Sequence, residues 1–296
     1  MSLHVELLVD AKNAVGESPL WHAGEQALYW VDIPAQALHR WHAEQGVKTW
    51  KSSEMIGCIA LHAAGGFIAG MESGVFHLRP QLSGSMEEKK LASITQPLPG
   101  MRFNDGRCDR QGRFLAGTML MNMAESRQEG CVACYEKSSE LKEIVNGLYT
   151  LNGMAFSPDG RTMYFSDSHP KSQIIWASDY DTASGTLSNR RVFVDMNPLP
   201  GRPDGAAVDT DGCYWICGND AGLIHRFTPL GKLDHSIEVP VKKPSMCSFG
   251  GADMKTLYVT SIHPANIDLT DQPLAGGVFA LRPGAQGIEE PVFQPR

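Results

Sequence analysis

Short apolar runs, each bounded by glycine, proline, aspartate or asparagine, recur along most of the chain. The runs are rich in β-branched and aromatic residues, and apolar positions at helical spacing are almost absent. The clearest example has an apolar run at 152–156, the turn Ser157-Pro158-Asp159-Gly160, and further runs at 162–167 and 174–177. This pattern predicts antiparallel strands joined by tight turns.

The same order of runs recurs six times in 296 residues, with a period of about 49 residues, as in propeller blades. The copies span residues 18–41, 58–78, 105–135, 152–177, 202–227 and 245–281. One small sheet cannot bury both of its faces, but sheets stacked radially can. We therefore predict an all-β fold, a six-bladed β-propeller forming a single domain over 1–296. We expect the terminal runs 3–9 and 291–293 to pair and close the ring.

Composition narrows the possible partners. The formal net charge is -7 and the isoelectric point is near 5.8, which argues against nucleic-acid and anionic-membrane surfaces. The N-terminal stretch lacks the basic start and apolar core of a signal peptide, and no run has the length of a membrane span. We therefore expect a cytoplasmic monomer or small homo-oligomer. The odd number of cysteines, 7, favours free thiols. Cys131 and Cys134 have metal-ligand spacing, but strand residues three apart face opposite sides.

Four polar residues are candidates for a site at the central channel. The innermost strand of each blade points one end at this channel, so residues just before these strands are expected on one ring. They are Glu17, Asn104, Asn152 and Asp204, and each lies near glycine or proline. Taken singly, each could be a turn or strand-capping residue. Together their carboxylate and amide oxygens favour a central metal site for a hard divalent cation.

Several motifs give the chain a resemblance to a known family. It resembles the SMP-30/gluconolactonase/LRE family, also called regucalcin-like proteins, whose fold is a six-bladed propeller. The similar segments are Gly-Glu-Ser-Pro-Leu-Trp at 16–21, Arg-Phe-Asn-Asp-Gly at 102–106, Gly-Arg-Phe-Leu-Ala-Gly-Thr-Met at 112–119, Leu-Asn-Gly-Met-Ala-Phe-Ser-Pro-Asp-Gly at 151–160, Tyr-Phe-Ser-Asp-Ser at 164–168 and Arg-Pro-Asp-Gly at 202–205.

The resemblance implies roles for individual residues. It implies that Glu17, Asn152 and Asp204 bind one divalent metal, that Arg102 and Asn104 contact substrate, and that Asp204 is also the acid/base. Some members of the family carry a substrate-binding Glu shortly after the Gly-Thr-Met run. Asn122 stands near that position here and is expected to bind substrate with a hydrogen-bonding group but no charge, which leaves the choice of sugar open.

The function we predict is metal-dependent hydrolysis of a sugar lactone to the aldonic acid. The cation, which could be Ca, Zn, Mg, Mn or Fe(II), would polarise the carbonyl, and Asp204 would move the proton. Two alternatives remain: a metal-binding propeller without turnover, and a phosphotriesterase-type hydrolase, because fold alone does not separate them. His169 and His263, each before a proline, either line the cavity mouth or are turn residues.

Overall fold

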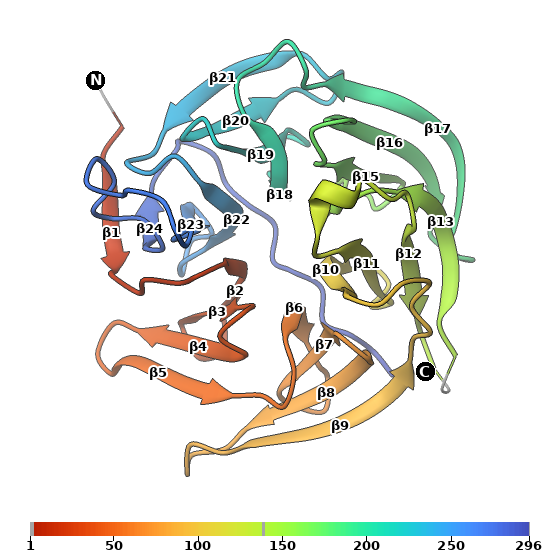
Figure 1. The fold of residues 1–296 in the computed structure, drawn as a ribbon, viewed down its shortest axis with the longest axis horizontal. Coiled ribbons are helices and arrows are strands. Elements are labelled where there is room, and N and C mark those ends of the chain that lie inside the picture. Colours follow the sequence, from red (N-terminus) through yellow and green to blue (C-terminus); the bar gives the residue numbers. More distant parts are fainter. Residues whose placement is uncertain (1–2, 138–139, 296) are drawn as a thin grey trace.

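Six antiparallel sheets of four strands stand around a central channel (Figure 1). The computed structural model describes residues 3–137 and 140–295. Successive sheets follow the order of the chain around the ring, so each repeat of the sequence forms one blade. The predicted all-β, six-bladed propeller is thereby confirmed.

In the first five blades the four strands follow the sequence from the innermost to the outermost. In the sixth blade the three inner strands follow the same order, and the N-terminal strand forms the outer edge. The strands are β2 (Gly16–His22), β3 (Ala27–Asp32), β4 (Ala37–His42) and β5 (Gly46–Lys51) in blade one; β6 (Ile56–Leu61), β7 (Phe67–Met71), β8 (Gly74–Pro80) and β9 (Met86–Ser93) in blade two; β10 (Met101–Cys108), β11 (Phe114–Leu120), β12 (Gly130–Tyr135) and β13 (Lys142–Leu148) in blade three; β14 (Leu151–Phe156), β15 (Thr162–Asp167), β16 (Ile174–Asp181) and β17 (Thr186–Asp195) in blade four; β18 (Arg202–Val208), β19 (Tyr214–Asn219), β20 (Leu223–Phe227) and β21 (Leu233–Glu238) in blade five; β22 (Pro244–Gly250), β23 (Thr256–Ser261), β24 (Val278–Leu281) and β1 (Val5–Val9) in blade six.

In the first five blades the fourth, outer strand is the part of the fold that the apolar pattern did not reveal. Strands β5, β9, β13, β17 and β21 each bury only one or two residues, and β5 buries only Trp50. An outer strand pairs along one edge and faces solvent widely, so its sequence is polar and lacks a continuous apolar run.

The ring closes differently from the prediction. Strand β1 pairs with β24, with Val5 opposite Leu281, rather than with residues 291–293. Val5 and Leu7 pack against the core of blades five and six. Phe293 instead forms a bridge with His62 of blade two and is 1% exposed. The expected pairing of the two termini was therefore wrong, because β24 offers the N-terminal strand a free edge and the buried Phe293 anchors the C-terminal segment elsewhere.

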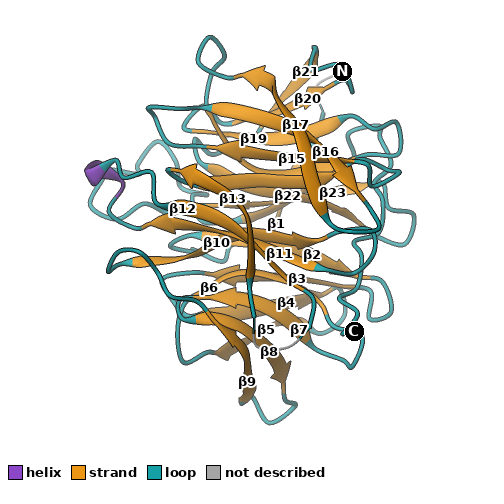
Figure 2. Ribbon diagram, turned by 90° about the vertical axis from the view of Figure 1, so that its right-hand side faces the viewer, coloured by secondary structure: helices purple, strands orange, loops and turns teal. Residues whose placement is uncertain are grey.

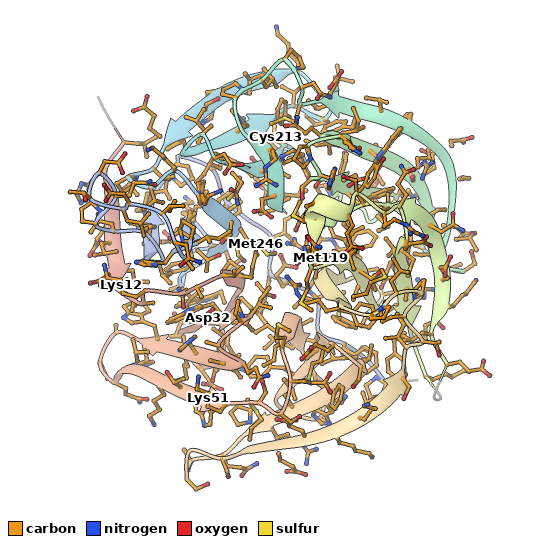
Figure 3. All side chains as sticks on the ribbon, viewed as in Figure 1. Lys12, Asp32, Lys51, Met119, Cys213 and Met246 are labelled. Atoms are coloured by element: carbon orange, nitrogen blue, oxygen red, sulfur yellow. The ribbon has the colours of Figure 1, made fainter. Side chains whose placement is uncertain are left out.

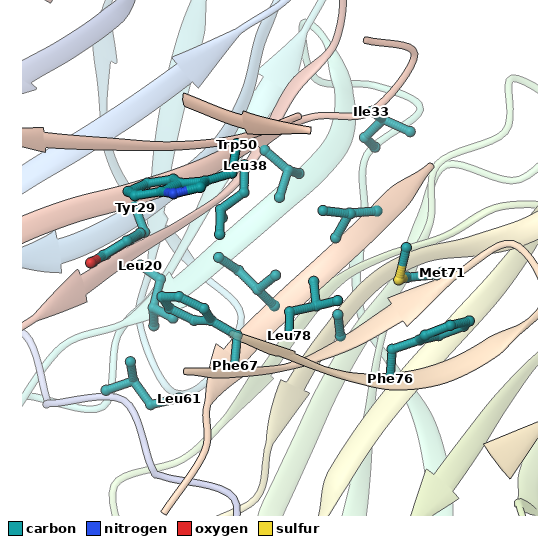
Figure 4. Packing of buried hydrophobic residues seen from close by; sticks show 14 of the residues in the cluster. Leu20, Tyr29, Ile33, Leu38, Trp50, Leu61, Phe67, Met71, Phe76 and Leu78 are labelled. Carbon is teal, nitrogen blue, oxygen red and sulfur yellow. The ribbon is translucent and has the colours of Figure 1, made fainter. Parts of the chain in front are cut away.

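Apolar layers between the blades hold the ring together. Between blades one and two, Leu20, Tyr29 and Leu38 pack with Phe67 and Leu78 (Figure 4). All five are nearly inaccessible to solvent, and full burial of one such side chain contributes about 1.5–3 kcal/mol. Each blade therefore depends on its neighbours, and residues carried by different inner strands keep a fixed separation.

The two ends of the channel are covered by different segments. A 3₁₀ turn, η1 (Met123–Glu125), projects at one end, and the C-terminal segment lies at the other (Figure 2). That segment crosses the ring, where Thr210 N donates to Gln286 O at 2.8 Å and Arg107 forms an ion pair with Glu290 at 2.9 Å. No helix formed by residues 3–137 or 140–295 is long and apolar enough to cross a membrane. All seven cysteines are free thiols, including Cys131 and Cys134.

Candidate functional site

A β-bulge lies in the inner strands β2, β10, β14, β18 and β22, where two residues face one on the partner strand. Glu17 and Asn152 are the last paired residues before their bulges, whereas Asn104 and Asp204 are the first residues inside theirs. We expected all four just before the strands and at one equivalent position. That was wrong, because they lie within the strands in two adjacent registers, where a bulge redirects side chains. Figure 3 shows Met246, in the bulge of β22, near the middle of the ring.

A chain of hydrogen bonds connects blades three and four. Arg102 Nη1 donates to Asn104 Oδ1 at 2.8 Å, and Asn104 Nδ2 donates to Asn152 Oδ1 at 2.9 Å. Asn152 Nδ2 then donates to Ser168 Oγ at 2.7 Å. All four side chains are buried. The structure thus brings together three of the predicted residues and fixes the orientation of both amides.

Asp204 has a partner that the sequence reasoning missed. Asn219, at the end of β19, donates from Nδ2 to Asp204 Oδ2 at 2.5 Å. Asn219 Oδ1 is buried and accepts no hydrogen bond from the described residues. Asn219 pairs with Arg202 on the neighbouring strand, and Arg202 precedes Asp204 by two residues. Nothing in the local sequence marks Asn219, because this contact arises only from strand pairing.

Glu17 is held by an unusual backbone. The next residue, Ser18, has φ 51°, a backbone conformation that residues other than glycine rarely adopt. Ser18 N donates to Glu17 Oε2 at 3.3 Å, and Ser18 Oγ accepts from Ile59 N at 2.9 Å. The turn is therefore fixed by blade two, and such local strain is common where a side chain must be presented to a site.

Burial makes ionised carboxylates unfavourable at this site. Burial raises the pKa of Glu17 well above its ordinary value, and the nearby Asp204 and Asp105 raise it further. Burial also raises the pKa of Asp204 to about 7, although the Asn219 hydrogen bond and Arg202 oppose the shift. The pKa of Asp105 is raised to about 6 by burial. Arg102 is the buried cation among them, and burial lowers its pKa to about 10.

These side chains have the chemistry that a hard cation requires. Two carboxylates that repel one another and an amide oxygen form an all-oxygen donor set. Asp105 Oδ1 is a further buried oxygen without a hydrogen-bond partner in the described residues. Within 3–137 and 140–295, no three His, Cys, Asp or Glu side chains gather as a metal site. The predicted set has only two, Glu17 and Asp204, and its third donor is Asn152. The residues therefore fit a divalent cation.

Three other predicted residues lie outside this group. Asn122 is exposed and donates to Glu125 at 2.8 Å, so its contact with substrate stays a prediction. His169 is buried, and its ring stacks on Tyr149 and contacts Met123 O of η1 at 3.0 Å. It therefore holds the turn at that end of the channel, while His263 N donates to a backbone carbonyl of the loop before β2 at 2.9 Å.

Two large grooves lie away from the candidate residues. Grooves of about 500 and 690 Å³ lie between blades one and two and between blades four and five, and neither contains any of the predicted residues. The site is recognised instead by the hydrogen bonds that join Arg102, Asn104 and Asn152 and by the electrostatic influence of Asp204 and Arg102 on Glu17.

Comparison with known proteins agrees with the motifs. The family described as SMP-30/Gluconolactonase/LRE-like region matches residues 15–263. The chain belongs to this family. Among SMP-30/gluconolactonase relatives, a 6-deoxy-6-sulfogluconolactonase of Pseudomonas putida is 37% identical over 296 residues, covering 99% of both chains. A regucalcin of Danio rerio is 32% identical over 293 residues, covering 97% of both.

Solved structures give the same family. A calcium-binding regucalcin from Agrobacterium tumefaciens is 26% identical and superimposes with a TM-score of 0.89, covering 99% of this chain and 98% of its own. The names of these SMP-30/gluconolactonase relatives include a sulfogluconolactonase, a regucalcin and one calcium-binding protein.

Proposed function

We propose that this protein hydrolyses a sugar lactone to its aldonic acid and that a divalent cation assists the reaction. The observation that carries the proposal is the buried group of Glu17, Asp204, Asn152 and Arg102, which combines repelling carboxylates with a guanidinium. The sugar lactonase relative of 37% identity supports lactones as the substrate class. A site that only bound a metal, without catalysis, would need the carboxylates but not the oriented Arg102.

The side chains have complementary roles in this proposal. Glu17, Asn152 and Asp204 would hold the cation, which when bound supplies Lewis-acid polarisation of the lactone carbonyl. Asp204 accepts the proton of the attacking water and later delivers it to the leaving ring oxygen. Asn219 donates a hydrogen bond to Asp204 Oδ2 and thereby orients the carboxylate.

Arg102 positions the substrate. Both of its hydrogen bonds to the described residues come from Nη1, to Phe103 O and Asn104 Oδ1, each at 2.8 Å. The N–H groups on Nε and Nη2 are therefore available for sugar hydroxyls or the carbonyl. Because the guanidinium is buried, such bonds are stronger than they would be in water.

The test is acid release in a pH-stat from a panel of aldonolactones, with and without chelator. Asp204→Asn should lower kcat about 10²- to 10⁴-fold, the usual contribution of a general base, with an unchanged circular dichroism spectrum. Asp10→Asn, at an exposed carboxylate, is the matched control. Near-normal turnover in Asp204→Asn would remove this residue from the mechanism.

Two other outcomes would replace the proposal. Calcium binding without acid release from any lactone would favour a metal-binding protein, the property that the name of the Agrobacterium tumefaciens regucalcin gives for that relative. Chelator-sensitive activity restricted to phosphotriesters would favour the third function that shares this fold.

A further inference from the structure

Three positively charged residues, Arg102, Arg202 and Lys243, occupy the same register position in three blades. Arg102 faces Met119 and Arg202 faces Asn219, each one residue before the last pair that precedes the bulge. Lys243 has this place in blade six, where its carbonyl accepts from Ile262 N at 3.0 Å and Pro244 forms the last pair. Arg102 enters the buried site, so Arg202 and Lys243 are left at the same end of the channel in neighbouring blades.

One carboxylate holds both of these cations. Arg202 Nε donates to Asp220 Oδ2 at 2.6 Å, and Lys243 Nζ donates to Asp220 Oδ1. Two positive charges share one negative charge, which leaves this cluster with a net charge of about +1. The side chains of Arg202 and Lys243 are 25% and 27% exposed. They are therefore partly shielded from water but still reachable by a ligand.

The cluster is joined to the proposed acid/base by a single turn. Asn219 and Asp220 are consecutive, and the first bonds to Asp204 while the second holds the cations. Asp220 has φ 78°, in the left-handed region that aspartate enters more readily than most residues other than glycine, so its side chain suits this turn. The proximity of Arg202 also counts among the factors that lower the pKa of Asp204. The cation pair consequently borders the reaction site.

The spacing suits the far end of a sugar. Arg202 precedes Asp204 by two strand residues, which corresponds to about 6.5 Å along the strand. That is comparable with the distance from the carbonyl carbon of a six-carbon lactone to an anionic group carried on its terminal carbon. An oxyanion at the terminal carbon could receive charge-assisted hydrogen bonds from both cations while the carbonyl lies beside Asp204.

We propose that Arg202 and Lys243 bind an anionic substituent, a sulfonate, phosphate or carboxylate, on the carbon of the lactone most remote from its carbonyl. The proposal rests on the lactonase function proposed above. Asp220 orients the two cations and prevents their mutual repulsion in the absence of substrate. A neutral sugar would gain nothing from this arrangement, so the enzyme should prefer the anionic lactones.

Lys243→Gln tests this proposal, with Lys242→Gln as the matched control. Lys242 is the adjacent residue, 59% exposed, and pairs with Asp271 away from the cluster. The substrates are glucono-1,5-lactone and its 6-phospho and 6-deoxy-6-sulfo derivatives, with a glucarolactone as the carboxylate. We expect Lys243→Gln to lower kcat/KM for the preferred anionic lactone about 10- to 100-fold, mostly through KM, as for loss of one charge-assisted hydrogen bond. Activity on the neutral lactone should change less than about twofold in both variants.

Calorimetry separates failure of this proposal from failure of the lactonase function. If no lactone is hydrolysed, the lactonase function fails, but 6-phosphogluconate and 6-deoxy-6-sulfogluconate should still bind the wild-type protein more tightly than gluconate and lose that advantage in Lys243→Gln. The proposal is overturned if the wild type does not prefer any anionic ligand. Equal losses on neutral and anionic ligands, or equal behaviour of the two lysine variants, would also overturn it and leave Asp220 as a purely structural link between blades five and six.

Discussion

Replacement of Asp105 by Asn should stabilise the metal-free protein, although Asp105 is 4% exposed and lies in a bulge at the site. Its Oδ2 accepts from Met154 N at 2.8 Å, and its Oδ1 has no hydrogen-bond partner in the described residues. Burial raises the pKa of this carboxyl from 3.8 to about 6, although Arg107 opposes the shift. Asn keeps an oxygen for Met154 and does not ionise.

The expected magnitude follows from that pKa and depends on pH. Because the folded form binds the proton more tightly than the unfolded form, wild-type stability falls as pH rises from about 4 to about 7. The pKa is raised by about 2.2 units, and each unit is worth about 1.4 kcal/mol. The raised pKa therefore lowers the free energy of unfolding of the wild type by about 3 kcal/mol at pH 8, by about 1.6 kcal/mol at pH 5 and by almost nothing at pH 3.5. Asp105→Asn removes this contribution, so its advantage over the wild type should grow with pH.

Urea unfolding in the presence of chelator, repeated from pH 4 to pH 8, measures this difference. Asp10→Asn is the control, because its carboxylate is exposed and should give a difference near zero throughout. A variant that is less stable than wild type at pH 8 would refute the reasoning. So would a difference that does not vary with pH, since burial would then not be the source of the effect.

Two further substitutions test the packing around the site and the segment that closes the other end of the channel. Gly117→Ala should lower the free energy of unfolding by about 1–3 kcal/mol, because an added Cβ would lie 1.9 Å from Leu151 Cδ2. An unchanged urea unfolding curve would contradict this and would show that β14 shifts easily to make room. Glu290→Gln should lower the free energy of unfolding by about 1–3 kcal/mol, because the buried Arg107 loses its ion pair. In the same assay Glu129→Gln, at an exposed pair, should have little effect.

The sequence predicted the parts of the fold that bury apolar surface locally. The three inner strands of each blade alternate with turns, and each inner strand buries most of its residues, as β14 does. The outer strands of the first five blades were missed because exposed residues such as those of β17 leave no apolar signal. The pairing of β1 with β24 joins segments far apart in sequence, and nothing near Val5 specifies its partner.

The candidate site was predictable in composition but not in geometry. Glycine and proline near Asn152 and Asp204 marked positions where backbone and polar groups crowd together. The bulges place these residues in two different registers, and this offset has no sequence signature because it depends on pairing with the second strand. Asn219 and the Arg202–Asp220–Lys243 cluster were missed for the same reason.

The buried carboxylates connect stability with the proposed function. Glu17, Asp105 and Asp204 each have a raised pKa because they are buried, and the first is raised further by the other two. Folding must therefore supply the free energy that keeps three acids close together, and the apolar layers between blades do so. A bound cation would return part of that free energy by favouring the ionised forms. The property that makes Asp105→Asn stabilising without metal should then make the wild-type site, and not the variant, the better binder of a divalent cation.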